Sequence, residues 1–255
     1  MRKYNDLKCF SIGFEFEFYL NNKNRNLFKV AKMLENRLGV KVEVPYVVKN
    51  NRKHLVKYSL KFKPTDKTYL LLIDGSGGKD MLELVTGPIP YWKSRMVLIK
   101  VLSLIDEIGY TTDKSGLHIN VSVRKHCSGF RESIFMMNVV EFLMNFDEEY
   151  IYKYFPNRKD VVYCLPVTKF LTPSMVHDSE YNLSYPILKY LSINFTKLPI
   201  GYIEFRHIGG EGYHKKVLEI LDIIEYICFS LIKTINGEKN LQLKKEFDEK
   251  YYYNL

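Results

Sequence analysis

The 255-residue sequence has no apolar run long enough to cross a bilayer, and it contains a single alanine, Ala31. Its most apolar stretch, residues 223–232, is too short to span a membrane and includes Glu225. The opening residues MRKYNDLKCF lack the apolar segment of a signal peptide. We therefore expect a cytoplasmic protein. The scarcity of alanine beside plentiful lysine, asparagine, isoleucine and tyrosine indicates an A/T-rich genome, that of a phage or a low-GC bacterium, and a phage protein would work in the host cytoplasm.

Cysteine is also scarce, and its spacing excludes the common metal and redox motifs. The four cysteines are Cys9, Cys127, Cys164 and Cys228, with no C-x-x-C pair and no zinc-ligand spacing. We expect reduced and largely buried thiols.

Hydrophobic residues make up 46% of the chain and charged residues 26%, which excludes a disordered or fibrous protein. The net charge of +9 is concentrated between Lys41 and Lys67, where eight basic and two acidic residues supply +6. Apolar residues alternate with polar ones there, which predicts a strand-rich hairpin with a basic face. Two interpretations of these lysines are open: they keep an edge strand soluble, or they bind an anion such as ATP or nucleic acid. We favour the first interpretation, because no nucleic-acid-binding module accompanies them.

Apolar periodicity and glycine or proline stops predict one α+β domain over residues 1–237, followed by a charged tail over residues 238–255. The expected helices cover residues 27–38, 92–108, 132–145 and 213–235. The expected strands cover residues 10–20, 58–62, 69–73, 81–85, 117–123, 191–196 and 202–207. Residues 155–186 hold four prolines and are expected to form an irregular loop.

The segment Gly13-Phe14-Glu15-Phe16-Glu17-Phe18 carries the first functional signal. Side chains alternate between the faces of a strand, so the phenylalanines share one face while Glu15 and Glu17 share the other. Taken alone, this pattern is typical of an amphipathic strand with two solvated glutamates.

The same arrangement recurs in three more predicted strands. Glu83 interrupts the apolar strand MLELV, His118 and Asn120 share one face of GLHINV, and Glu204 and Arg206 share one face of YIEFR. A solvated sheet face would be richer in lysine, threonine and serine, so this set indicates a site. If the strands join one antiparallel sheet, helices cover its apolar face and the other face forms a cavity lined by four glutamates.

Clustered carboxylates repel one another in a cleft and require a cation. Their oxygen atoms favour Mg²⁺, and one imidazole is also compatible with Mn²⁺. Mg²⁺ in such sites is commonly completed by water and phosphate oxygens, and an arginine such as Arg206 can clamp a phosphate.

The chain resembles the amidoligase family in four motifs and in their order. They are GFEFEF, the Asp-Gly-Ser turn before ELVTGP, GLHINV, and an asparagine before EFRH. These are ATP-dependent carboxylate–amine ligases related to glutamine synthetase and glutamate–cysteine ligase. The resemblance covers residues 11–210 and implies a mostly antiparallel curved sheet, with helices on one face and a metal and ATP cavity on the other.

The resemblance also implies roles for individual residues. The metal ligands would be Glu15, Glu17, Glu83, His118 and Glu204, and Arg206 would contact the nucleotide phosphate. Many family members have a second histidine where this chain has Asn120, which can hydrogen-bond a phosphate or substrate. Asn194, one strand before the E-x-R motif, is a further candidate contact. The catalytic pair would be Glu204 and Arg206.

The implied reaction transfers the ATP γ-phosphoryl group to a carboxylate, and an amine then displaces phosphate to form an amide. The substrates would be a small-molecule or peptide carboxylate and an amine, and the oligomeric state is open. Two alternatives remain: a phosphotransferase that uses the same metal site on another acceptor, and a non-enzymatic basic nucleic-acid-binding protein.

Three neighbouring features receive structural interpretations. Gly75–Lys79 does not match a phosphate-binding P-loop, because Ile73 stands where the first glycine is needed. Asp74 either supports a metal or caps that turn, and we favour the turn. His207 is expected to be structural, since it faces away from Arg206 on a regular strand.

Overall fold

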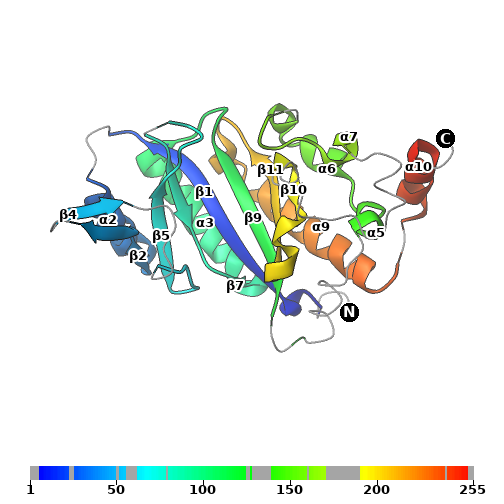
Figure 1. Cartoon of the computed structure of the whole chain (residues 1–255), viewed down its shortest axis with the longest axis horizontal. Helices are drawn as coiled ribbons and strands as arrows, with labels where there is room; N and C mark the ends of the chain where they lie inside the picture. Colours follow the sequence, from blue (N-terminus) through cyan, green and yellow to red (C-terminus); the bar gives the residue numbers. More distant parts are fainter. Residues whose placement is uncertain are drawn as a thin grey trace. The chain divides into compact units, whose positions relative to one another are not determined.

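The computed structural model describes residues 6–22, 26–49, 52–55, 62–78, 80–124, 127, 139–159, 161–170, 190–238 and 240–251. The chain is α+β, with a mixed, mostly antiparallel open sheet (Figure 1). Nine strands of the described residues belong to this sheet, in the order β10-β11-β9-β1-β6-β5-β2, with β7 and β8 each paired to β1. No helix within the described residues is long and apolar enough to cross a membrane.

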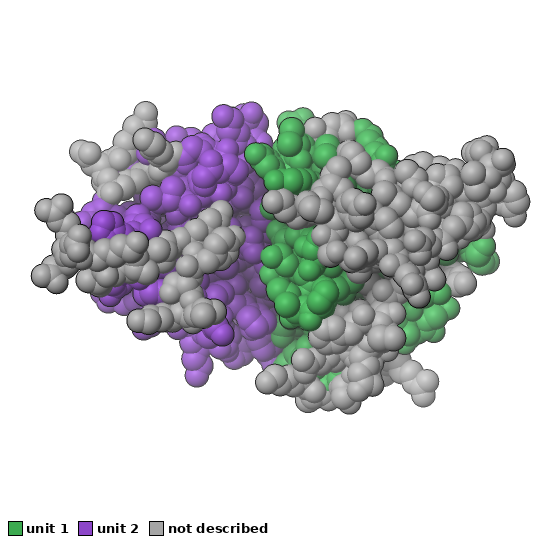
Figure 2. Space-filling view, viewed as in Figure 1, with its two compact units in different colours: residues 1–11, 121–208, 218–255 green, residues 12–120, 209–217 purple. Residues whose placement is uncertain are grey.

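Clustering of contacts divides the chain into two compact units (Figure 2). Unit 1 comprises residues 1–11, 121–208 and 218–255, and unit 2 comprises residues 12–120 and 209–217. Strands β1, β9 and β11 each contribute residues to both units, so neither unit is a continuous piece of sequence.

Unit 2 holds most of the predicted N-terminal strands. Its strands are β1 (Phe10–Leu20, from Ile12 onward), β2 (Lys41–Glu43), β3 (Tyr46–Lys49), β4 (Arg52–Leu55), β5 (Thr68–Ile73), β6 (Leu82–Val85), β7 (Ile89–Pro90), β8 (Gly109–Tyr110) and the first part of β9 (Gly116–Val123). Its helices are α2 (Leu27–Leu38) and α3 (Tyr91–Ile108), with the 3-10 turn η5 (Tyr213–Lys215). Figure 1 shows α3 behind the strands, where it covers one face of the sheet.

The helix ends follow the local sequence. Asn26 caps α2 by accepting hydrogen bonds from the backbone N–H groups of Phe28 and Lys29. Gly39 ends the helix in the left-handed conformation, with φ 72°. The predicted boundaries of this helix are confirmed.

The predicted basic hairpin is confirmed only in part. β3 and β4 form a separate antiparallel pair, whereas β2 joins the main sheet by pairing in parallel with β5. The predicted strand over residues 58–62 lies almost entirely outside the described residues.

Unit 1 contains β10 (Ile193–Asn194), β11 (Tyr202–Gly209) and the helix α9 (Val217–Ile235), which lies behind these strands in Figure 1. Its shorter elements are η1 (Leu7–Cys9), α5 (Val139–Leu143), α6 (Glu148–Tyr152), η2 (Pro156–Arg158), α7 (Val167–Phe170), η4 (Phe195–Ile200) and α10 (Leu241–Tyr251). An aromatic cluster joins the strands to α9: the ring of Phe146 lies 5.6 Å from Phe205 and 5.3 Å from Tyr226. Much of the predicted helix over residues 132–145 lies outside the described residues, and so does part of the predicted loop over residues 155–186.

Two predicted boundaries are wrong in unit 1. The strand expected over residues 191–196 is limited to Ile193–Asn194, because the Asn194 side chain accepts from the Thr196 backbone N–H and starts a 3-10 helix. The long helix begins at Val217 instead of residue 213. The residues before it form a 3-10 turn that follows Gly212, whose φ is 70°.

The prediction of four reduced cysteines is wrong for two of them. Cys9 and Cys127 form a disulfide across 118 residues of sequence. The backbone N–H of Arg124 donates to the carbonyl of Cys9, which brings the two segments together. Sequence spacing cannot reveal such a tertiary contact. Cys164 and Cys228 are free and buried, as predicted.

Candidate metal-binding site

The alternating glutamates of β1 lie as the sequence predicts. Phe14, Phe16 and Phe18 are fully buried on one face. Glu15 and Glu17 therefore project from the other face, where Glu17 is 6% exposed. The interpretation of two solvated glutamates therefore does not hold for Glu17, because its carboxylate is buried away from water.

A second carboxylate stands directly opposite on the neighbouring strand. Glu17 pairs with Glu83 in the antiparallel register of β1 and β6. Directly opposed residues of an antiparallel pair share a face, and like charges in that position destabilise the pair. Glu83 is only 7% exposed, so water screens this repulsion poorly.

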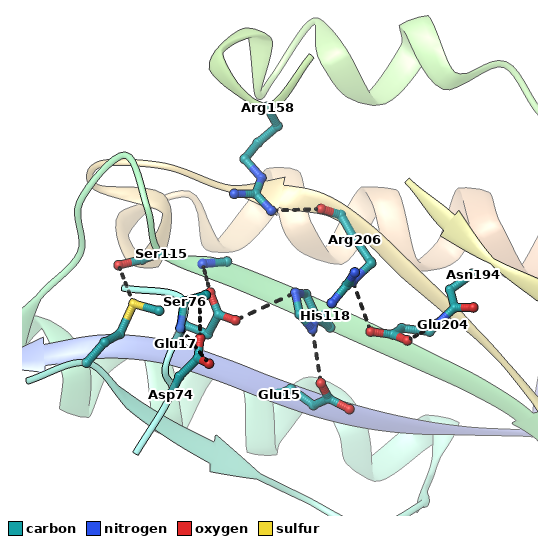
Figure 3. A network of polar contacts seen from close by, with 12 residues as sticks. Glu15, Glu17, Asp74, Ser76, Ser115, His118, Arg158, Asn194, Glu204 and Arg206 are labelled. Atoms are coloured by element: carbon teal, nitrogen blue, oxygen red, sulfur yellow. Dashed lines mark hydrogen bonds and ion pairs between the residues drawn. The ribbon is translucent and has the colours of Figure 1, made fainter. Parts of the chain in front are cut away.

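An imidazole from β9 lies between the two glutamates of β1. His118 Nδ1 is 3.0 Å from Glu15 Oε2, and His118 Nε2 is 3.8 Å from Glu17 Oε1. Figure 3 shows His118 reaching toward both carboxylates. The three carboxylates and one imidazole of unit 2 therefore share one face of its strands, as the sequence predicts.

Two further contacts orient the carboxylates. The Asn120 side-chain amide donates to Glu15 Oε1 at 2.8 Å, and the backbone N–H of Gly116 donates to Glu17 Oε2 at 2.6 Å. Asn120 Oδ1 is buried and has no hydrogen-bond partner among the described residues. Asn120, which departs from the amidoligase pattern, thus holds the predicted metal ligand Glu15 in place and presents an additional oxygen atom of its own.

This donor set fits a divalent cation. Carboxylate and amide oxygens are ligands that Mg²⁺ and Mn²⁺ accept, and Mn²⁺ also accepts an imidazole nitrogen. The carboxylates of Glu17 and Glu83 are buried, and a bound cation would neutralise their negative charge.

Unit 1 contains the other predicted site residues, on β10 and β11. The Asn194 side-chain amide donates to Glu204 Oε2 at 2.7 Å, and Arg206 Nε lies 3.1 Å from Glu204 Oε1 (Figure 3). Glu204 is 5% exposed. The structure therefore groups Asn194 with the predicted catalytic pair. That these residues share one site with the carboxylates of unit 2 stays a prediction.

His207 has the structural role that the sequence predicts. Its Nε2 lies 3.1 Å from Glu148 Oε1, and its ring packs beside Phe146 and Tyr152. This buried pair belongs to the face of β11 that carries Phe205.

Asp74 also behaves as predicted, as a turn residue. Its carboxylate accepts from the backbone N–H of Ser76 and contacts the Ser76 hydroxyl. The Tyr19 hydroxyl donates to the carbonyl of Gly77 at 2.9 Å and fixes the same turn.

Arg158 and Glu148 are buried charged residues that are absent from the sequence-based set. Arg158 is 3% exposed, and its guanidinium donates to the backbone carbonyl of Arg206 at 3.2 Å. It ends the short 3-10 helix η2 in a proline-containing segment with little apolar periodicity, so no local pattern distinguishes it from a surface arginine.

Comparison with protein-family models and with curated proteins gives no match to this chain.

Proposed function

We propose that this protein is an ATP-dependent carboxylate–amine ligase that works with a divalent metal ion. The observation that carries the proposal is the buried pair Glu17 and Glu83, directly opposed in β1 and β6, with Glu15 and His118 on the same face. Such a concentration of negative charge is costly in a folded protein unless a cation balances it.

In this proposal, Glu15, Glu17, Glu83 and His118 of unit 2 supply the metal ligands. Glu204 of unit 1 keeps its proposed role as the partner of Arg206. Asn120 holds Glu15 in place through its 2.8 Å hydrogen bond. Bound Mg²⁺ or Mn²⁺ would supply charge neutralisation and alignment for phosphoryl transfer.

ATP enters the proposal through Arg206 and through the resemblance to amidoligases. A guanidinium is suited to a phosphate because its planar fork matches two oxygens. Glu204 orients that fork at 3.1 Å, and Asn194 in turn orients Glu204. The transferred phosphoryl group would activate a carboxylate substrate, and an amine would then replace phosphate to give an amide.

The decisive experiment is incubation of the purified chain with ATP, Mg²⁺, acidic peptides and a panel of amines, followed by mass spectrometry. A ligase yields products equal to acid plus amine minus water, together with ADP. The Glu83→Gln variant should lose this activity. Glu107→Gln should keep it, because Glu107 is an exposed residue at the end of α3.

Other outcomes identify the alternatives. A phosphorylated acceptor without amide, even when amines are present, would indicate a phosphotransferase. Salt-sensitive binding to nucleic acid that Glu83→Gln leaves unchanged, with no ATP turnover, would overturn the enzymatic proposal.

A further inference from the structure

Glu17 is held at two points by groups from outside β1. Its carboxylate accepts a hydrogen bond from the backbone N–H of Gly116 at 2.6 Å, and its backbone carbonyl accepts one from the Tyr213 hydroxyl at 3.0 Å. Tyr213 is fully buried in the 3-10 turn η5, so this second contact lies in the interior of unit 2. The side chain and the main chain of one predicted metal ligand are therefore both held by hydrogen bonds.

Both contacts depend on the same segment of chain. The N–H of Gly116 and the carbonyl of Ser115 belong to one planar peptide group. That carbonyl accepts from the backbone N–H of Gly210 at 2.8 Å, so the peptide group is held on both sides. Gly210 has a φ of 95°, which glycine adopts at little cost, and its own carbonyl accepts from the backbone N–H of Tyr213 at 3.3 Å. The turn that carries Tyr213 thus supports the Glu17 carboxylate as well as its main chain.

The residue after Tyr213 anchors this turn. His214 Nε2 lies 3.3 Å from Asp106 Oδ1 in the last turn of α3, and His214 Nδ1 lies 3.0 Å from the Thr111 hydroxyl oxygen. A neutral imidazole that donates to the carboxylate accepts from the hydroxyl, because it carries one donor and one acceptor. Burial lowers the pKa of His214 and so favours this neutral form. Thr111 Oγ1 in turn accepts from the backbone N–H of Gly212 at 2.9 Å, which ties the turn to the chain that follows α3.

We infer that Tyr213 is a positioning residue that holds Glu17 in the geometry for binding a divalent cation, an inference that rests on the metal site of the proposed function. A glutamate side chain gives up rotamer freedom when it binds a cation, and this ordering lowers the affinity. Glu17 is already ordered by its two hydrogen bonds, so less affinity is lost. The Tyr213 hydroxyl bonds to the main chain of Glu17, and its effect on the cation therefore passes through that ligand.

The test measures the affinity of the whole chain for Mn²⁺ by calorimetry. Tyr213→Phe removes only the hydroxyl, and we expect it to bind Mn²⁺ about tenfold more weakly, the lower end of the effect of residues that orient a metal ligand. Tyr226→Phe is the matched control, because it removes a hydroxyl that bonds to the backbone of Asp147 in unit 1. This control should lower the melting temperature and still bind Mn²⁺ like the wild type.

Wild-type affinity for Mn²⁺ in a folded Tyr213→Phe protein would overturn the inference. An equal loss of affinity in Tyr226→Phe would also overturn it, because affinity would then follow stability alone. If Tyr213→Phe does not fold, two variants of the residue that anchors its turn give the answer. Thr111→Val loses the hydroxyl and should weaken Mn²⁺ binding, whereas Thr111→Ser keeps the hydroxyl and should restore it. Equal affinity in these two variants would contradict the inference.

Failure of the proposed metal site gives a different result from failure of the positioning role. If the wild-type chain does not bind Mn²⁺ at all, the metal site is refuted, and the role of Tyr213 is refuted with it. If the wild type binds Mn²⁺ and the loss of the Tyr213 hydroxyl changes nothing, only the positioning role is refuted and the metal site stands.

Discussion

Glu17 and Glu83 lie directly opposite each other in the antiparallel pair of β1 and β6, and each residue is more than nine-tenths buried. Their repulsion weakens the sheet unless a cation lies near them. Replacing both with glutamine should therefore raise the melting temperature in EDTA by about 2–4 °C, which corresponds to about 1 kcal/mol for a chain of this size. A thermal melt measures this directly, and a sharp fall would mean that the two glutamates are structural partners.

The same double variant should lose its response to metal. Millimolar Mg²⁺ or Mn²⁺ should stabilise the wild-type fold through mass action, because a ligand that binds only the native state shifts the unfolding equilibrium. Melting curves over a metal titration measure the gain. Glu107→Gln serves as the control, and an equal gain in the Glu17→Gln/Glu83→Gln protein would contradict the assignment of these two ligands.

Asn120 should influence metal affinity through Glu15. Its amide holds Glu15 Oε1 at 2.8 Å, and residues that orient a metal ligand commonly contribute ten- to a hundredfold to affinity. Asn120→Ala should weaken Mn²⁺ binding by about that factor, measured by calorimetry. Ser122→Ala, two residues further along the same strand, provides the matched control and should bind Mn²⁺ like the wild type.

Arg206→Lys separates catalysis from structural pairing. Lysine keeps the charge but loses the planar fork, so turnover should fall by about a hundredfold, on the scale of losing one key electrostatic donor, while ATP affinity falls less. Steady-state rates and melting temperature should be measured on one preparation. A protein that melts earlier yet turns over normally per folded molecule would show that Arg206 is only the ion-pair partner of Glu204.

Glu148 should make the fold sensitive to acid. Burial alone would raise the pKa of this carboxyl, but the His207 side chain, the Ser192 hydroxyl and the Thr168 backbone N–H lower it below the usual value. A carboxyl with a depressed native pKa stabilises the fold above its unfolded pKa, and this contribution is lost as the pH falls through the native pKa. Urea unfolding between pH 7 and pH 3 should show the loss. Glu148→Gln should cost about 1–3 kcal/mol at pH 7, the scale of leaving buried hydrogen-bonding groups without their partner, and should flatten the acid-side decline.

The disulfide between Cys9 and Cys127 should stabilise the protein by about 2–4 kcal/mol, since it closes a long loop of the unfolded chain. Reduction with dithiothreitol should lower the midpoint of urea unfolding accordingly. The Cys9→Ser/Cys127→Ser protein is the control, because its midpoint should not respond to the reductant.

Local sequence was sufficient to predict which face of an individual strand is buried and where a helix ends. The alternation from Phe14 to Phe18 determines which side chains are buried in β1, because a strand repeats every two residues. Gly39 ends α2 because it can adopt a positive φ. His207 is placed opposite Arg206 by the same alternation, and its pairing with Glu148 agrees with that placement.

Tertiary structure decided how those faces meet. No local pattern determines that Glu83 faces Glu17, that Asn120 holds Glu15, or that Cys9 meets Cys127, because each contact depends on strand register or on segments far apart in sequence. The buried charge of Arg158 is the extreme case, since the short helix η2 that it ends carries no apolar periodicity. Periodicity fixes the direction of a side chain relative to its own backbone, whereas the partner that it meets depends on the packing of the whole chain.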